Sequence, residues 1–207
     1  MILLGKGPHL WPFLFEVLIL KLILASTSPY RKELLNRLQI PFECEASHVD
    51  EEKFEQQIND PHLLTKTLAF EKAKSVFSNN REALVIGGDQ LSVIDNKILG
   101  KPHTFENACN QLRELSNRKH TLITSVCLMS QQNVIEFYDE TILSMRDLSD
   151  AEIKDYVTKD NPLNCAGSYK IESLGISLFN SIDSKDFTAI MGLPLMQLSA
   201  YIRELNN

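Results

Sequence analysis

The segment ALVIGGDQLSVIDNKILGKP, residues 83–102, constrains the fold of this chain most strongly. It begins as an apolar run typical of a buried strand, and Asp95-Asn96 has the composition of a two-residue hairpin turn. A hairpin makes adjacent strands antiparallel, whereas strands and helices alternate along the rest of the chain, which is typical of parallel pairing. The sequence therefore predicts an α/β protein with a mixed sheet.

Helix and strand signals elsewhere fit this plan. Ser28 followed by Pro29 predicts a helix start, and Ser149 with Glu152 three residues later predicts a capping box. The predicted strands are residues 22–25 and 40–49, two or three between 120 and 145 broken by a turn at 131–133, and another after 175. The predicted helices are residues 29–38, 62–77, 104–115 and 148–157, and a C-terminal helix from about 194.

Composition excludes several classes of protein. The net charge of −6 provides no basic field for nucleic acid, so cations that bind an anionic ligand must be local. The four cysteines form no CxxC pair and the five histidines form no HxxxH pair, so we expect no zinc site. The cysteines are typical of reduced thiols, which predicts a cytoplasmic protein.

The N-terminal region is apolar over residues 9–25 but is interrupted by Pro12, Glu16 and Lys21. A membrane span needs about 20 apolar residues in a row, so we expect no transmembrane helix. We interpret residues 1–20 as an extension ahead of a single domain at 21–207, and a peripheral anchor is the alternative.

The hydroxyl-rich stretch before the first helix is a candidate anion site. The N–H groups at a helix start attract phosphate or carboxylate, Ser26, Thr27 and Ser28 add donors, and Arg31 can bind two oxygens at once. An ordinary capped helix with a solvated arginine is the better explanation when S-P-x-R is taken alone. The chain has no GxxxxGK[ST] motif, which excludes a P-loop.

Lys72 lies on the apolar stripe of its helix, in line with Leu64, Leu68 and Val76. Such a lysine either extends its amine to solvent or points at an anion, and the pattern does not choose between these.

Asp89 follows Gly87-Gly88 at the end of an apolar run, where ligands collect in open α/β sheets. It is a candidate general base or metal ligand, with a turn-capping role as the alternative. If Asp95-Asn96 is the turn, Gln90 lies opposite Lys101, which returns that lysine close to Asp89. Arg31, Lys72 and Lys101 around one carboxylate would suit hydrolysis of an oligophosphate.

These motifs resemble one family. LASTSPYRKELL, VDE, LAFEKA, GGDQ, GKP, CAGSYKIESLG and GLP occur in order from about residue 21 to the C-terminus and are similar to those of the Maf family of nucleoside triphosphate pyrophosphatases. The resemblance implies a twisted mixed sheet flanked by helices, with two lobes and a central cleft, as in inosine triphosphatase-like folds. It also implies hydrolysis of a nucleoside triphosphate to the monophosphate and diphosphate.

The resemblance also implies roles for individual residues. Asp89 would activate water as the catalytic residue; Ser26, Arg31, Lys72 and Lys101 would bind the triphosphate. Glu51, with Asp89, would place a divalent cation, Mg²⁺ or Mn²⁺, or the water. The expected partner is a modified nucleoside triphosphate rather than nucleic acid or a membrane, and a homodimer is left open.

Three positions distinguish branches of this family. Tyr30, Gln90 and Glu172 resemble the branch that hydrolyses 7-methyl-GTP, although Tyr30 replaces a frequent tryptophan and Ser173 replaces a glycine. Glu172 can accept both donors of a guanine edge, and Tyr30 can stack on the cationic methylated base. Removal of modified nucleotides is the implied role. The alternatives are a dTTP/UTP pyrophosphatase of the same family and a non-catalytic regulator of cell division.

Overall fold

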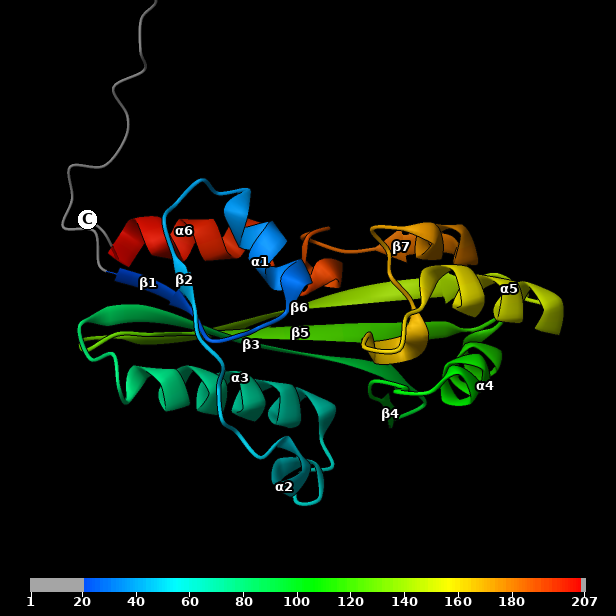
Figure 1. Ribbon diagram of the computed structural model, residues 1–207, viewed down its shortest axis with the longest axis horizontal. Helices are drawn as coiled ribbons and strands as arrows, with labels where there is room; N and C mark the ends of the chain where they lie inside the picture. The colour runs from blue at the N-terminus through cyan, green and yellow to red at the C-terminus, as the bar shows by residue number, and fades with distance from the viewer. Residues whose placement is uncertain (1–20, 206–207) are drawn as a thin grey trace, which may run out of the picture.

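The computed structural model describes residues 21–205, which form a seven-stranded mixed sheet flanked by helices (Figure 1). The strand order is β2-β1-β3-β5-β6-β7, with β4 paired to β3. The strands are β1 (Lys21–Leu24), β2 (Glu43–Cys44), β3 (Ala83–Ile94), β4 (Lys97–Leu99), β5 (Lys119–Met129), β6 (Val134–Met145) and β7 (Phe179–Asp183). β1 is parallel to β2 and β3, and the other ladders are antiparallel. The predicted mixed α/β fold is confirmed, and the predicted extension at 1–20 lies outside the described residues.

Helices cover both faces of the sheet. α3 (Pro61–Phe77) lies along one face, and α1 (Pro29–Asn36) and α6 (Leu195–Leu205) lie along the other, as Figure 1 shows. α4 (Phe105–Leu115) and α5 (Asp150–Asp160) pack together at the opposite end of the long strands. The remaining helices are α2 (Glu51–Glu55) and three short 3₁₀ helices, η1 (Ala166–Ser168), η2 (Leu174–Leu178) and η3 (Ala189–Met191). Within the described range, no helix has both the length and the apolar character needed to cross a membrane.

The apolar core is divided between the two ends of the sheet. At one end, side chains alternate along β3: Leu84 and Ile86 join the core under α1 and α6, and Ala83 and Val85 join the core under α3. At the other end, α4, α5 and the far parts of β5 and β6 share a separate core that contains Leu112, Ile153, Leu143 and Tyr169. β3 and β5 run through both ends, so their middle residues lie between two packed regions.

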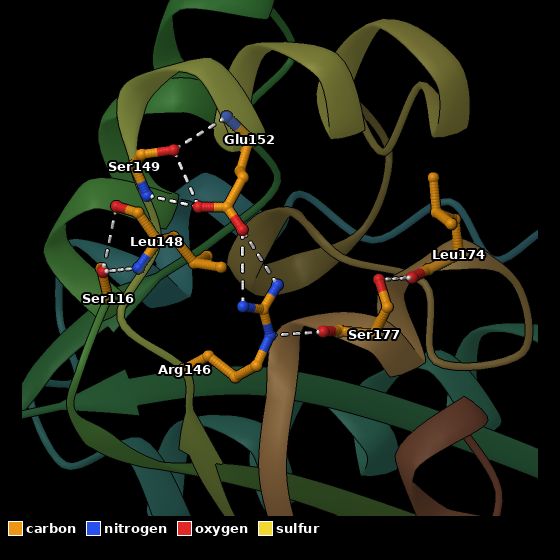
Figure 2. A network of polar contacts seen from close by, with 7 residues as sticks. All are labelled: Ser116, Arg146, Leu148, Ser149, Glu152, Leu174 and Ser177. Atoms are coloured by element: carbon orange, nitrogen blue, oxygen red, sulfur yellow. Dashed lines mark hydrogen bonds and ion pairs between the residues drawn. The ribbon is translucent and has the colours of Figure 1, made fainter.

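The predicted helix starts are confirmed. Ser28 and Thr104 each accept a hydrogen bond from a backbone N–H of the first turn. Ser149 and Glu152 form the complete capping box at the start of α5, where Arg146 also reaches Glu152 (Figure 2). These contacts satisfy N–H groups that have no partner inside the helix.

The strand predictions need one correction. The strand expected at 40–49 is reduced to the two residues of β2. β1 ends at Leu24, so only Glu43 and Cys44 find partners on it, and Pro41 has no N–H to donate. The predicted hairpin turn and the turn at 131–133 are both present, and they leave two long strands, β5 and β6, between 119 and 145.

Candidate active site

The candidate residues gather where β3 has an open edge. β1 pairs with β3 only as far as Ile86, and β4 pairs with it only from Ser92. In the described part of the chain, residues 87–91 therefore have β5 on one side and no strand on the other. The carboxyl end of β1 and the start of α1 open onto this interval, which is where ligands bind in open α/β sheets.

Gly87 brings helix α3 unusually close to this interval. A Cβ at Gly87 would lie 2.1 Å from the carbonyl oxygen of Ala69 and 2.7 Å from the backbone nitrogen of Ala73. Only a residue without a side chain allows this approach. Because side chains alternate along a strand, Asp89 points to the same face as Gly87, toward Lys72 of α3.

Lys72 is bound by two carboxylates. Its Nζ lies 2.7 Å from Oδ1 of Asp89 and 3.0 Å from Oε1 of Glu51, which begins α2. Lys72 is 7% exposed and Asp89 is 5% exposed, so Lys72 points at anions rather than extending to solvent. The other oxygen of Asp89, Oδ2, is buried and has no hydrogen-bond partner within the described range. A buried carboxylate oxygen without a partner is costly, and such atoms are typical of functional sites.

Arg31 lies beside this cluster, packed against two glycines. Its Nε donates to the carbonyl oxygen of Gly192 at 3.2 Å. A Cβ at Gly192, whose φ is +114°, would lie 3.2 Å from Cγ of Arg31, and one at Gly88 would lie 3.6 Å from its Nε. Desolvation lowers the pKa of Arg31, while Asp89 and Glu51 act in the opposite direction. The guanidinium stays charged and keeps donors available for an oxyanion.

The hydroxyls before α1 are used partly for local structure. Ser28 Oγ accepts from the Arg31 N–H at 3.5 Å, and Ser26 Oγ accepts from the Ser28 N–H at 3.2 Å. These contacts hold the backbone N–H groups of the helix start near Arg31, while Thr27 is exposed. The hydroxyl protons of Ser26 and Ser28 make no hydrogen bond to described residues, so both remain available to an acceptor.

Lys101 is not where the extrapolated hairpin places it. The β3–β4 ladder pairs Ile94 with Lys97 as predicted but ends at Ser92 and Leu99, so the expected pairing of Gln90 with Lys101 does not form. Lys101 is exposed and makes no ion pair with any residue from 21 to 205. The chain turns away after Leu99, and His103 N–H donates to the carbonyl of Leu163 at 3.0 Å.

Gln90 is occupied by internal contacts. Its Nε2 donates to Thr124 Oγ1 at 2.8 Å and to the carbonyl of Ala189 at 2.9 Å. Ala189 begins η3, and the carbonyl of Gly192 just after η3 accepts from Arg31. The amide therefore ties β3 to the segment that holds Arg31, and its donors serve the protein rather than a base.

Tyr30 and Glu172, which are far apart in the sequence, lie close enough for the charge of Glu172 to act on the Tyr30 hydroxyl. Burial raises the pKa of Tyr30 to about 12, with further contributions from Cys165, Glu172 and Asp160. The Cys165 thiol lies near the Tyr30 hydroxyl, and the structure has no hydrogen bond between these two described residues. Glu172 is exposed, and among the described residues it has no ion-pair partner, so its carboxylate can receive donors of a ligand.

Sequence reasoning missed Asp160 and Cys165. Cys165 lies inside the CAGSYKIESLG motif but carries no signal that distinguishes it from a structural thiol. Asp160 is the last residue of α5, where a negative charge opposes the helix dipole, and that position is a usable signal.

The carboxylates of the candidate site could bind a divalent cation if the phosphates of a bound substrate supplied further ligands. No group of three or more potential metal ligands occurs among residues 21–205. Mg²⁺ is commonly bound by one or two carboxylates and completed by water and substrate phosphates. The unpartnered Oδ2 of Asp89, together with Glu51, fits this arrangement. A cavity of about 750 Å³ beside Lys21 and Asn80 is lined by none of the candidate residues and is not part of the candidate active site.

Comparison with known proteins identifies the family of this chain. The family model described as Maf-like protein matches residues 21–205, which is the whole described range. The 7-methyl-GTP pyrophosphatase of Bdellovibrio bacteriovorus is 45% identical to this chain over 186 residues, which are 90% of this chain and 97% of that protein. The proteins of the same name from Colwellia psychrerythraea and Pseudomonas syringae are 41% and 43% identical, covering 88% and 86% of this chain and 92% of each relative.

Proposed function

Because the chain belongs to the Maf family, we propose that it hydrolyses 7-methyl-GTP to 7-methyl-GMP and diphosphate, and so removes a modified nucleotide from the pool. The observation that carries this proposal is the state of Asp89. One carboxylate oxygen is held by Lys72, and the other is buried and has no partner among residues 21–205, at a sheet edge that faces Arg31 and the start of α1. This arrangement suits a fixed base beside a site for phosphate.

Asp89 would act as the general base. Its Oδ2 would take a proton from water as the water oxygen attacks the α-phosphorus, and the bond from that phosphorus to the oxygen bridging to the β-phosphate would break. Diphosphate leaves with that oxygen, and the nucleoside monophosphate retains the oxygen of water. The contact with Lys72 orients the carboxylate, so that Oδ2 and not Oδ1 faces the reaction.

The cations would neutralise the charge that builds up on the phosphates. Arg31, the N–H groups at the start of α1, and the hydroxyl of Ser26 would bind phosphate oxygens, and the exposed Lys101 would reach the outer phosphates. A divalent cation, bound by Glu51 and phosphate oxygens with Asp89 beside it, would supply further neutralisation of charge.

Base selection would rest on Tyr30 and Glu172. Methylation at N7 makes guanine cationic, so a tyrosine face gains a cation–π attraction of about 0.5–2 kcal/mol. Glu172 would accept the two donors on the guanine edge, whereas the acceptors of thymine or uracil would leave it unpaired. Gln90 would contribute indirectly, since its amide holds η3 and through it the segment beside Arg31.

We also place the protein in the cytoplasm. All four cysteines are free thiols in the structure, including the buried Cys109 and Cys127, as expected in a reducing compartment.

Product analysis tests the proposed function. Purified protein is incubated with 7-methyl-GTP, GTP, dTTP, UTP or CTP, with Mg²⁺ or Mn²⁺, and the products are separated and identified. We expect 7-methyl-GMP and diphosphate in equal amounts and a clear preference for the methylated base. Preference for dTTP or UTP would contradict the account of base selection, and absence of hydrolysis of every nucleotide would contradict the proposal.

A further inference from the structure

The loop that carries Glu172 is fastened to helix α5 on both sides of that residue. On one side, the N–H of Lys170 donates to the hydroxyl of Tyr156 at 3.0 Å, and Lys170 Nζ donates to the carbonyl of Asp160. On the other side, Ser173 Oγ donates to Oδ1 of Asp160 at 2.6 Å. Glu172 itself has no such tether to any described residue, so its position depends on these neighbours.

The turn between the two attachment points is tight. The N–H of Ser173 donates to the carbonyl of Lys170 at 3.3 Å. A Cβ at Gly175 would lie 2.3 Å from the same carbonyl oxygen, so the chain crosses closely over Lys170. A small movement of Ser173 would therefore displace the side chain of Glu172 relative to Tyr30.

The far side of the loop is held separately. Figure 2 shows Arg146 between Ser177 of η2 and Glu152 at the start of α5. Its Nε donates to the carbonyl of Ser177 at 2.8 Å. Helix α5 thus supports the loop through Asp160 at its end and through Glu152 at its beginning, and the Asp160 end is the one next to Glu172.

Asp160 is an unusual residue for its place. A carboxylate at the last position of a helix opposes the partial negative charge of the helix end, which is unfavourable. Its Oδ2 is buried without a hydrogen-bond partner in the described part of the chain. It also lies close enough to Tyr30 to raise the pKa of that hydroxyl. An aspartate at this position is explained if its carboxylate holds the loop that carries Glu172, since it does not stabilise the helix.

We infer that Asp160, through its hydrogen bond from Ser173, is a positioning residue that holds Glu172 in place and thereby supports recognition of the guanine base. This inference rests on the proposed function and adds to it a residue of this chain that does not touch the substrate. Its effect should appear in recognition of the base and not in the chemical step, because Asp89 lies on a different element.

The test compares Asp160→Ala, Ser173→Ala and their double variant with the parent, using kcat and KM for 7-methyl-GTP and for GTP. Each single change should raise KM about tenfold for both 7-methyl-GTP and GTP and leave kcat nearly unchanged, since each removes a hydrogen bond to a charged group. The double variant should match the singles, because both remove one interaction. Asp160→Asn keeps an acceptor for Ser173 and should restore KM.

Ser177→Ala is the matched control. Its hydroxyl donates to the carbonyl of Leu174 at 2.8 Å in the same loop and makes no hydrogen bond to a described residue of α5, so the KM of this variant should equal that of the parent. Melting temperatures of all variants identify any that fail to fold, and Ser173→Ala decides the question if Asp160→Ala unfolds.

Three results would overturn the inference: an unchanged KM in Ser173→Ala, an equal loss of kcat for both nucleotides, or a failure of Asp160→Asn to restore KM. Calorimetric titration of the parent with 7-methyl-GMP separates this inference from the proposed function. A parent that neither hydrolyses nor binds 7-methylguanine nucleotides overturns both. A parent that does, with variants that behave identically, overturns the role of Asp160 alone.

Discussion

Lys72 Nζ lies 2.7 Å from Oδ1 of Asp89, and this buried contact joins helix α3 to the open edge of strand β3. The contact exists because Gly87 lets the helix approach the strand so closely. Glu51 adds a second carboxylate at 3.0 Å, so the one ammonium group organises two acids. The position of the candidate base therefore depends on a lysine, a glycine and a helix that are not themselves reactive.

Replacement of Lys72 by Met should remove the contact that holds the carboxylates of Asp89 and Glu51 in place. Removal of one member of a buried ion pair leaves the other charge without compensation, at a cost of about 3–5 kcal/mol. We expect a lower melting temperature and a loss of hydrolysis of about 100-fold or more, since Asp89 loses its orientation. The matched control is Lys66→Met on the same helix, because Lys66 is exposed and lies 3.5 Å from Glu136. Equal effects of the two changes would contradict the role assigned to Lys72.

Replacement of Gly87 by Ala should separate α3 from β3. The added Cβ would collide with backbone atoms of Ala69 and Ala73, which cannot rotate away. Overpacking of this kind costs about 1–3 kcal/mol, equivalent to a fall of about 2–4 °C in melting temperature for each kcal/mol in a chain of this size. Gly100→Ala is the control, since a Cβ there meets no atom within 4 Å. A Gly87→Ala protein with the stability and activity of the parent would show that the close approach is dispensable.

Substitutions of Tyr30 and Glu172 should differ in their effects on hydrolysis of 7-methyl-GTP and of GTP. Tyr30→Ala removes the aromatic face and should lower kcat/KM for 7-methyl-GTP by about 2- to 30-fold, with a smaller effect on GTP, which has no positive charge on the base. Glu172→Gln replaces an acceptor by a donor and should lower kcat/KM for both guanine nucleotides. Steady-state kinetics with the two nucleotides checks both outcomes. Equal losses for both nucleotides in Tyr30→Ala would rule out the cation–π contribution.

His120 should make the protein less stable in mild acid. Burial lowers its pKa to about 4, and its Nε2 lies 3.0 Å from the hydroxyl of Tyr169. Between about pH 6.5 and pH 4 the unfolded chain binds a proton that the folded protein does not, so stability falls as pH falls through this window. This residue alone should cost about 2 kcal/mol between pH 7 and pH 5.

Urea unfolding of the parent and of His120→Gln at pH 7 and at about pH 5 measures the contribution of His120 to stability. The variant should lose less stability on acidification than the parent. Asp139, whose pKa burial and Asp186 raise, acts in the opposite direction in both proteins and cancels in the comparison. An equal loss in the parent and the variant would show that His120 does not titrate as described.

Local signals in the sequence predicted the parts of the fold that depend on neighbouring residues. The capped starts of α1, α4 and α5 and the turn at Asp95-Asn96 are set by side chains within a few positions of each other. The apolar pattern placed Lys72 on the inner face of its helix, but whether it met solvent or an anion depended on how closely β3 approached. That distance is set by Gly87 and cannot be read from the helix alone.

Predictions that extrapolated a local pattern were less successful. Continuation of the hairpin placed Lys101 opposite Gln90, but β4 ends at Leu99, and the chain leads on to His103, whose N–H donates to the carbonyl of Leu163. The neighbourhood of Tyr30, Cys165 and Asp160 joins residues more than a hundred positions apart, and no periodicity connects them. A family resemblance suggested Tyr30 and Glu172 as specificity residues, but it gave no signal for the Asp160–Ser173 contact beside them.

The most direct test of the account is the release of diphosphate from 7-methyl-GTP by the parent and by Asp89→Asn, with folding checked by thermal melting. Asparagine keeps the size of the side chain but cannot accept the proton from water. We predict a rate about 100- to 10,000-fold below that of the parent in a protein that remains folded. A folded Asp89→Asn protein that releases diphosphate at the parent rate would contradict the assignment of Asp89 as the base.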